Sequence, residues 1–161
     1  TETALRSAWA DPMVSFATAA VPSHEEQVTT STGQSFRDPR RERKTIDFYE
    51  CLADVCADDM AEFAHTVRQA TNGEKLVGGF FGYIMELAWN GCFFSNKGSI
   101  AEAEISAMQQ SGHLGLHKVM HSPDMDFFVS PYGYAFRGLG GDCLPMEPGE
   151  ALRHHAKLYL M

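Results

Sequence analysis

Apolar side chains recur at three- and four-residue steps between Asp47 and Gln69, and this spacing predicts an α-helix with one face toward the core. Asp47, followed three residues later by Glu50, resembles a capping box at the start of this helix. Asn72 and Gly73 supply the left-handed stop that commonly follows the last turn. The side chains expected on the buried face are those of Phe48, Leu52, Val55, Cys56, Met60, Phe63 and Val67.

Three short segments are apolar almost without interruption: "KLVGGFFGYI" (75–84), "MDFFVSPYGY" (125–134) and "AKLYLM" (156–161). Strands that are buried on both faces have this pattern, which is typical of parallel sheets. The sequence therefore predicts three parallel strands.

Helical patterns accompany these strands. Residues 1–9 resemble the end of a helix, residues 99–108 and 111–121 predict two more, and a helix end precedes the last strand. Ser111 caps the second of these helices, which ends before Pro123. The polar stretch 23–44 is expected to be loop with a short helix. Alternating helices and strands predict right-handed βαβ units, and hence a single α/β domain over residues 1–161.

The negative net charge of the chain narrows the classes of partner that it could bind. A net charge of −8 argues against nucleic acid, since phosphate backbones call for clustered Lys and Arg. The basic run from Arg37 to Lys44 is interrupted by acids and a proline, and we interpret it as a solvated loop. No apolar run approaches the ~20 residues of a membrane-spanning helix. We expect a soluble, cytoplasmic chain with no membrane partner. The four cysteines form no CxxC pair, and we expect them to be reduced thiols packed as small apolar residues.

Candidate chemistry lies after the strands, because the segments at the carboxyl ends of parallel strands carry function in α/β folds. Tyrosine rings stack on the apolar faces of sugars and hydroxyl groups bond their rims, which favours a carbohydrate pocket. Aromatic packing at strand ends is the alternative. The candidate residues are Tyr83 and Glu86 after the first strand, and Ser130, Tyr132, Tyr134 and Arg137 after the second.

Three other patterns lead to weaker hypotheses. A glycosidase needs two carboxyl groups across the scissile bond, and Glu86, Glu147 and Glu150 are candidates, with plain surface acids as the alternative. "HLGLHKVMH" places three histidines on one helix face, where a metal could bind. The motif lacks the glutamate of HExxH, so a solvated helix face is favoured. The glycine-rich "GLGGD" has no following Lys-Ser/Thr. The sequence thus predicts no metal and no cofactor.

Five segments in order resemble the catalytic barrel of glycoside hydrolase family 42, the β-galactosidase-like enzymes. They are "ALRSAWADPMVSFATAAVPS", "DFYECLADVCADDMAEFAHTVRQ", "KLVGGFFGYIMEL", "SGHLGLHKVMHSPDMDFFVSPYGYAFRGLGGD" and "RHHAKLYL". The resemblance is to bacterial members and covers most of the chain, with residues 91–110 the least similar part. It implies that the three predicted strands are strands five, six and seven of a (β/α)8 barrel.

The resemblance also implies where catalysis lies. The family's acid/base glutamate follows an asparagine at the end of strand four, and its nucleophile stands at the end of strand seven. No Asn-Glu dipeptide occurs here, and the expected positions fall before Thr1 and after Met161. The resemblance therefore assigns no catalytic residue to this chain. It implies that a pocket for a β-galactoside is lined by the sugar-binding candidates, which are Tyr83, Glu86, Ser130, Tyr132, Tyr134 and Arg137.

We therefore expect a central fragment of a barrel: an open, mostly parallel sheet that belongs to a retaining glycosidase and is inactive alone. Three strands cannot close a barrel and leave edges unpaired, so we also expect a homo-oligomer. One alternative is a non-catalytic carbohydrate-binding or interaction domain of the α/β class. Another is a metal protein using His113 and His117.

Overall fold

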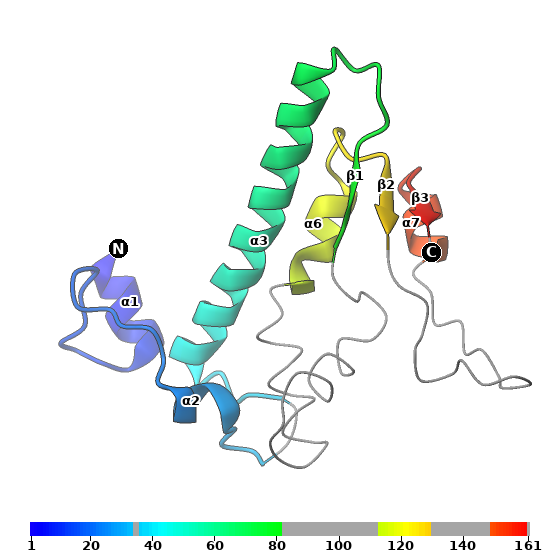
Figure 1. The fold of residues 1–161 in the computed structure, drawn as a ribbon. Coiled ribbons are helices and arrows are strands. Elements are labelled where there is room, and N and C mark those ends of the chain that lie inside the picture. The colour runs from blue at the N-terminus through cyan, green and yellow to red at the C-terminus, as the bar shows by residue number, and fades with distance from the viewer. Residues whose placement is uncertain (34–35, 82–112, 130–148, 161) are drawn as a thin grey trace, which may run out of the picture.

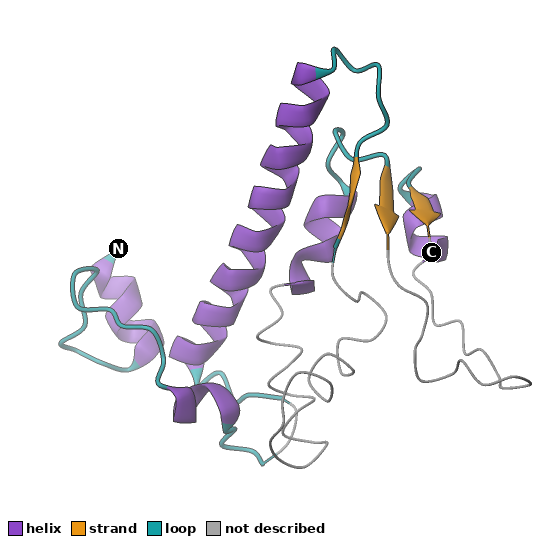
Figure 2. Ribbon diagram, in the orientation of Figure 1, coloured by secondary structure: helices purple, strands orange, loops and turns teal. Residues whose placement is uncertain are grey.

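The computed structural model describes residues 1–33, 36–81, 113–129 and 149–160. Helices and short parallel strands follow one another along this part of the chain (Figure 1, Figure 2). In order, the elements are α1 (Glu2–Trp9), α2 (His24–Val28), α3 (Arg43–Ala70), β1 (Gly78–Phe80), the 3-10 turn η1 (His113–Gly115), α6 (Leu116–Met120), β2 (Phe127–Val129), α7 (Gly149–His154) and β3 (Leu158–Leu160).

The three strands form one parallel sheet in the order β1-β2-β3, as the sequence predicted. Its register pairs Gly79 with Phe128 and Phe128 with Tyr159. Each predicted apolar segment supplies one strand of three residues. An α/β class with a small open parallel sheet is therefore confirmed. Within the described residues, no helix is both long and apolar enough to span a membrane.

Helix α3 is longer than predicted, because it begins at Arg43 rather than Asp47. The predicted cap is wrong: Glu42 occupies the N-cap position and makes no side-chain capping bond. Asp47 lies inside the helix, where its carboxylate accepts a hydrogen bond from Trp9 Nε1 at 2.8 Å and pairs with Arg43 at 2.7 Å. The bond from Trp9 fastens α1 to α3, whereas the pair with Arg43 lies within α3. The predicted stop is confirmed, with φ of 50° at Asn72 and 72° at Gly73.

The buried face of α3 also differs from the prediction. Phe63 is 69% exposed and Val55 is 49% exposed, whereas the small residues Ala53, Ala57 and Ala64 are buried. Close approach of η1 explains this difference. A Cβ on Gly115 would lie 2.7 Å from the carbonyl oxygen of Ala53 and 2.9 Å from Ala57 Cβ. Only small side chains fit beneath that backbone, so the larger apolar residues flank the contact.

The core lies on one face of the sheet. Phe128 of β2 is fully buried there, and Met60 of α3 comes so near β1 that a Cβ on Gly79 would be 2.6 Å from its Cε. Helices α3, α6 and α7 all contribute to this cluster. Its buried members are Ala57, Ala64, Val77, Phe81, Val119, Met120, Met125, Phe128 and Leu152.

The other face of the sheet is apolar and more open. Phe80, Leu158 and Leu160 are 51%, 53% and 46% exposed. They alternate along their strands with Gly79 and Tyr159, which belong to the core side. We call these three residues the open face. Parallel sheets normally have both faces covered.

Near the N-terminus, an ion pair organises the polar stretch before α3. The side chains of Arg37 and Glu42 are only 4% and 11% exposed, and their atoms approach to 2.8 Å. Arg37 also donates to the carbonyl oxygens of Gln27 and Thr29, at 2.6 and 2.8 Å. The prediction of a solvated basic loop is therefore wrong for Arg37, since its guanidinium is a structural anchor. Helix α2 is the short helix expected here, and Ser23 closes a capping box at its start.

Candidate functional site

The carboxyl ends of the three strands lie level at one edge of the sheet. Phe80 pairs with Val129, and Val129 pairs with Leu160. β1 and β2 therefore end side by side, and the predicted sugar-binding residues follow these two strands in the sequence. This geometry matches the usual location of functional sites in parallel α/β folds.

The predicted site residues themselves fall outside the described part of the chain. They are Tyr83, Glu86, Ser130, Tyr132, Tyr134 and Arg137. Glu147 is also outside it. Glu150 is described: it belongs to the first turn of α7 and pairs with Arg153 at 2.8 Å, with 78% of its side chain exposed. For Glu150, the alternative of a surface acid is therefore the better interpretation.

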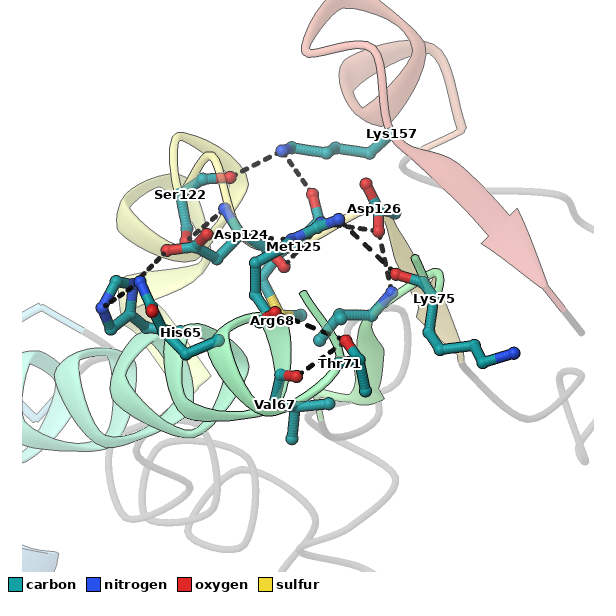
Figure 3. A network of polar contacts seen from close by, with 12 residues as sticks. His65, Val67, Arg68, Thr71, Lys75, Ser122, Asp124, Met125, Asp126 and Lys157 are labelled. Carbon is teal, nitrogen blue, oxygen red and sulfur yellow. Dashed lines mark hydrogen bonds and ion pairs between the residues drawn. The ribbon is translucent and has the colours of Figure 1, made fainter. Parts of the chain in front are cut away.

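The opposite edge, where the strands begin, carries a polar cluster that the sequence analysis missed (Figure 3). Asp126 directly precedes β2, and its Oδ2 accepts hydrogen bonds from the backbone N–H of Val77 at 2.8 Å and from Arg68 Nη2 at 2.7 Å. Its own carbonyl oxygen accepts from the N–H of Leu158 at 2.9 Å. One residue thus links all three strands to each other and to α3.

The electrostatics of this cluster are set by opposing effects. Burial alone would raise the pKa of Asp126, but the Val77 N–H and the Arg68 guanidinium outweigh it, so the pKa lies below its usual value. For Lys157, burial lowers the pKa against the opposing attraction of Asp126. The Lys157 ammonium donates to the carbonyl oxygens of Ser122, at 2.7 Å, and Met125. Asp126 therefore stays a carboxylate that accepts bonds.

His65 extends the cluster toward solvent. Its Nδ1 lies 2.8 Å from Asp124 Oδ2, and half of its side chain is exposed. Arg68 Nη2, at the centre of the cluster, also donates to the carbonyl oxygen of Asp124, at 3.1 Å. We interpret the cluster as a clamp that fixes the relative positions of the strands.

The predicted histidine face is only partly described. His117 and His121 lie at the end of α6, and the ring of His121 donates from Nδ1 to the carbonyl oxygen of His117 at 2.6 Å. The side chain of His113 lies outside the described part of the chain. Across the described ranges, no group of three or more His, Cys, Asp or Glu side chains is arranged to hold a metal ion.

Comparisons with protein-family models, with curated proteins and with solved structures find no match to this chain. Over the described residues, the fold is that of an α/β protein with a three-stranded parallel sheet, and α3, α6 and α7 pack into one core with it. The family stays a prediction that rests on the resemblance of the sequence.

Proposed function

We propose that the chain forms one wall of the catalytic (β/α)8 barrel of a β-galactosidase-like glycoside hydrolase. The observation that carries the proposal is the order of the sheet together with the side on which its helices lie. β1, β2 and β3 are neighbours in chain order, and α3, α6 and α7 all contribute to a single core. Right-handed crossovers between consecutive parallel strands place every helix on the same face. A barrel has this arrangement, whereas a doubly wound sheet has helices on both faces.

The open face supports the same proposal. In a barrel, the face opposite the helices looks inward and is filled by large apolar side chains from other strands. Phe80, Leu158 and Leu160 have the side chains that such an interior needs, and they are about half exposed in the chain alone. In this proposal, further strands cover them.

The site then lies at the edge where Phe80, Val129 and Leu160 end. Tyr83, Tyr132 and Tyr134 stack on the sugar rings, while Ser130, Glu86 and Arg137 bond their hydroxyl groups. The acid/base and nucleophilic glutamates of the retaining mechanism come from strands other than β1 and β2. This chain therefore binds sugar weakly and hydrolyses nothing by itself.

A titration tests the sugar site. The 161-residue chain is titrated with lactose while its backbone amide NMR signals are followed, and 4-nitrophenyl β-galactoside hydrolysis is assayed in parallel. We expect saturable shifts, loss of these shifts in Tyr132→Ala, and no hydrolysis. Phe16→Ala, a change at an exposed aromatic residue far along the chain from both candidate segments, is the control. Hydrolysis by the chain would place a catalytic carboxylate within it and refute the assignment of both glutamates to other strands.

The same titration distinguishes the barrel wall from the alternative function, a non-catalytic carbohydrate-binding domain. A non-catalytic sugar-binding domain would bind lactose tightly as an isolated chain, because its site would be complete. Absence of any shift in the wild-type chain, with the fold intact, would contradict both functions.

A further inference from the structure

We propose that His121 and His155 form a surface site for a divalent transition-metal ion of the Zn²⁺ or Ni²⁺ class. The two residues are far apart in sequence, but their ring centroids lie 4.4 Å apart with the planes at 67°. His121 directly follows α6 and His155 directly follows α7. The inference depends on neither the family nor the sugar site.

The tautomer of His121 suits a metal ligand. Its Nδ1 lies 2.6 Å from the carbonyl oxygen of His117. A carbonyl oxygen can only accept, so Nδ1 carries the proton of the neutral ring and Nε2 keeps a free lone pair. Metal-binding histidines almost always hold their second nitrogen in this way, by donating to a carbonyl or carboxylate.

The spacing of the rings suits a shared ion. A metal held at about 2.0–2.1 Å by two imidazole nitrogens keeps the ring centroids roughly 4.5–5 Å apart when the ligands are adjacent. The separation of 4.4 Å is near this span, so the two rings are close enough to share one ion. His121 is exposed and His155 is partly exposed, so water can reach the ion and complete its coordination.

The position of the pair favours a cation and gives it a structural consequence. Both histidines directly follow the C-terminus of a helix, where the helix dipole attracts positive charge. Helix α6 precedes β2, and α7 precedes β3. An ion shared between the two rings would join these neighbouring βα connections and stabilise the folded chain, because the unfolded chain does not hold the rings together.

Calorimetric titration of the tag-free chain with ZnCl₂ and with NiCl₂ tests the site. We expect one ion per chain, and an affinity lower by about a hundredfold in His155→Gln and in His121→Gln, since each variant leaves a single ligand. His154→Gln is the matched control, because this exposed neighbour takes no part in the ring contact and should bind as the wild type does. Binding that survives His155→Gln, or no binding to the wild type, would overturn the proposal.

A second measurement identifies the ligands. Substoichiometric Ni²⁺ is added while the histidine ring signals are followed by NMR. Broadening confined to His121 and His155 supports the pair. Broadening centred on His113, His117 or His24 would assign the ion to another site and refute the proposal. Thermal unfolding of each variant without metal shows whether the histidine change itself alters the fold.

Discussion

Replacing Asp126 by alanine should weaken the fold more than any exposed carboxylate does. The change removes one acceptor oxygen that serves both the N–H of Val77 and the guanidinium of Arg68. It leaves the Val77 N–H, just before β1, without its acceptor, and it removes the shortest ion pair of Arg68, at 2.7 Å, while the weaker contacts of Arg68 with Asp124 remain. We expect the sheet to lose its attachment to α3 at the edge where the strands begin.

The magnitude follows from the two bonds. A hydrogen bond to a charged group contributes about 1.5–3 kcal/mol to stability. The side chains of Asp126 and Arg68 are 27% and 23% exposed, so partial screening by solvent places each bond at the lower end of that range. Two such bonds give a loss of about 3 kcal/mol for Asp126→Ala. Asp126→Asn keeps one acceptor oxygen without the charge, and we expect about half of that loss.

Urea unfolding at pH 7, followed by circular dichroism, measures the free energy of unfolding of each variant. Asp54→Asn is the control, since Asp54 pairs with Lys118 on the surface and should leave the midpoint almost unchanged. A loss in Asp126→Ala no larger than in this control would refute the role of the clamp.

The pH dependence gives an independent check on the same residue. Because the pKa of Asp126 is lowered in the folded state, the unfolded chain binds more protons in mildly acidic solution. The stabilisation is therefore complete above the ordinary carboxyl pKa and is lost as the pH falls through the lowered value. Asp126→Asn should flatten this acid-side loss. An unchanged acid-side slope in the variant would contradict the assigned pKa direction.

Three further changes test other parts of the fold. Gly115→Ala should lower the free energy of unfolding by about 1–3 kcal/mol, because the added Cβ would meet the backbone of Ala53. Gly149→Ala is the control: a Cβ there has open space, so the change should be neutral or slightly stabilising. Urea unfolding measures both variants. Arg37→Ala leaves Glu42 without its buried partner and should cost about 3–5 kcal/mol in thermal unfolding, while Arg41→Ala, 72% exposed, should change little. The open face should make the isolated chain associate, so sedimentation should show a species larger than a monomer that Phe80→Ser with Leu158→Ser dissociates. Phe63→Ser, an equally apolar exposed site on α3, should not dissociate it; a monomeric wild type would contradict the role of the open face.

The strands could be predicted because their signal is local. Unbroken apolar runs around Gly79, Phe128 and Tyr159 predicted parallel strands, and β1, β2 and β3 do pair in parallel. The burial on both faces that the same runs predicted is found on the core side only, since the open face is about half exposed. The stop at Asn72 and Gly73 was equally local, since it depends on the backbone conformations that these two residues tolerate.

The face of α3 could not be predicted in the same way. Hydrophobicity favoured large residues such as Phe63, but the buried line is set by the approach of Gly115 to Ala53 and Ala57, a contact between segments far apart in sequence. The helix start was displaced for a similar reason, because Asp47 is used by Trp9 and Arg43 rather than by the helix end.

The polar clamp left only a faint signal. Asp126 is a single acid beside an apolar run, and such a residue is costly to bury unless it is paired. That cost could have marked it as a structural residue, but its partners Arg68 and Val77 lie too far away in sequence to be identified. The edge of the candidate site was predictable from strand direction, whereas the arrangement of Tyr83, Tyr132 and Tyr134 stays a prediction.

The coding sequence on either side of these 161 codons, followed by expression of the whole frame and an assay with 4-nitrophenyl β-galactoside, tests the barrel proposal most directly. We predict an Asn-Glu pair upstream, a glutamate shortly downstream, and hydrolysis that disappears when either glutamate is replaced by glutamine. A frame that encodes neither glutamate, or a full-length product that folds but hydrolyses no β-galactoside, would contradict it.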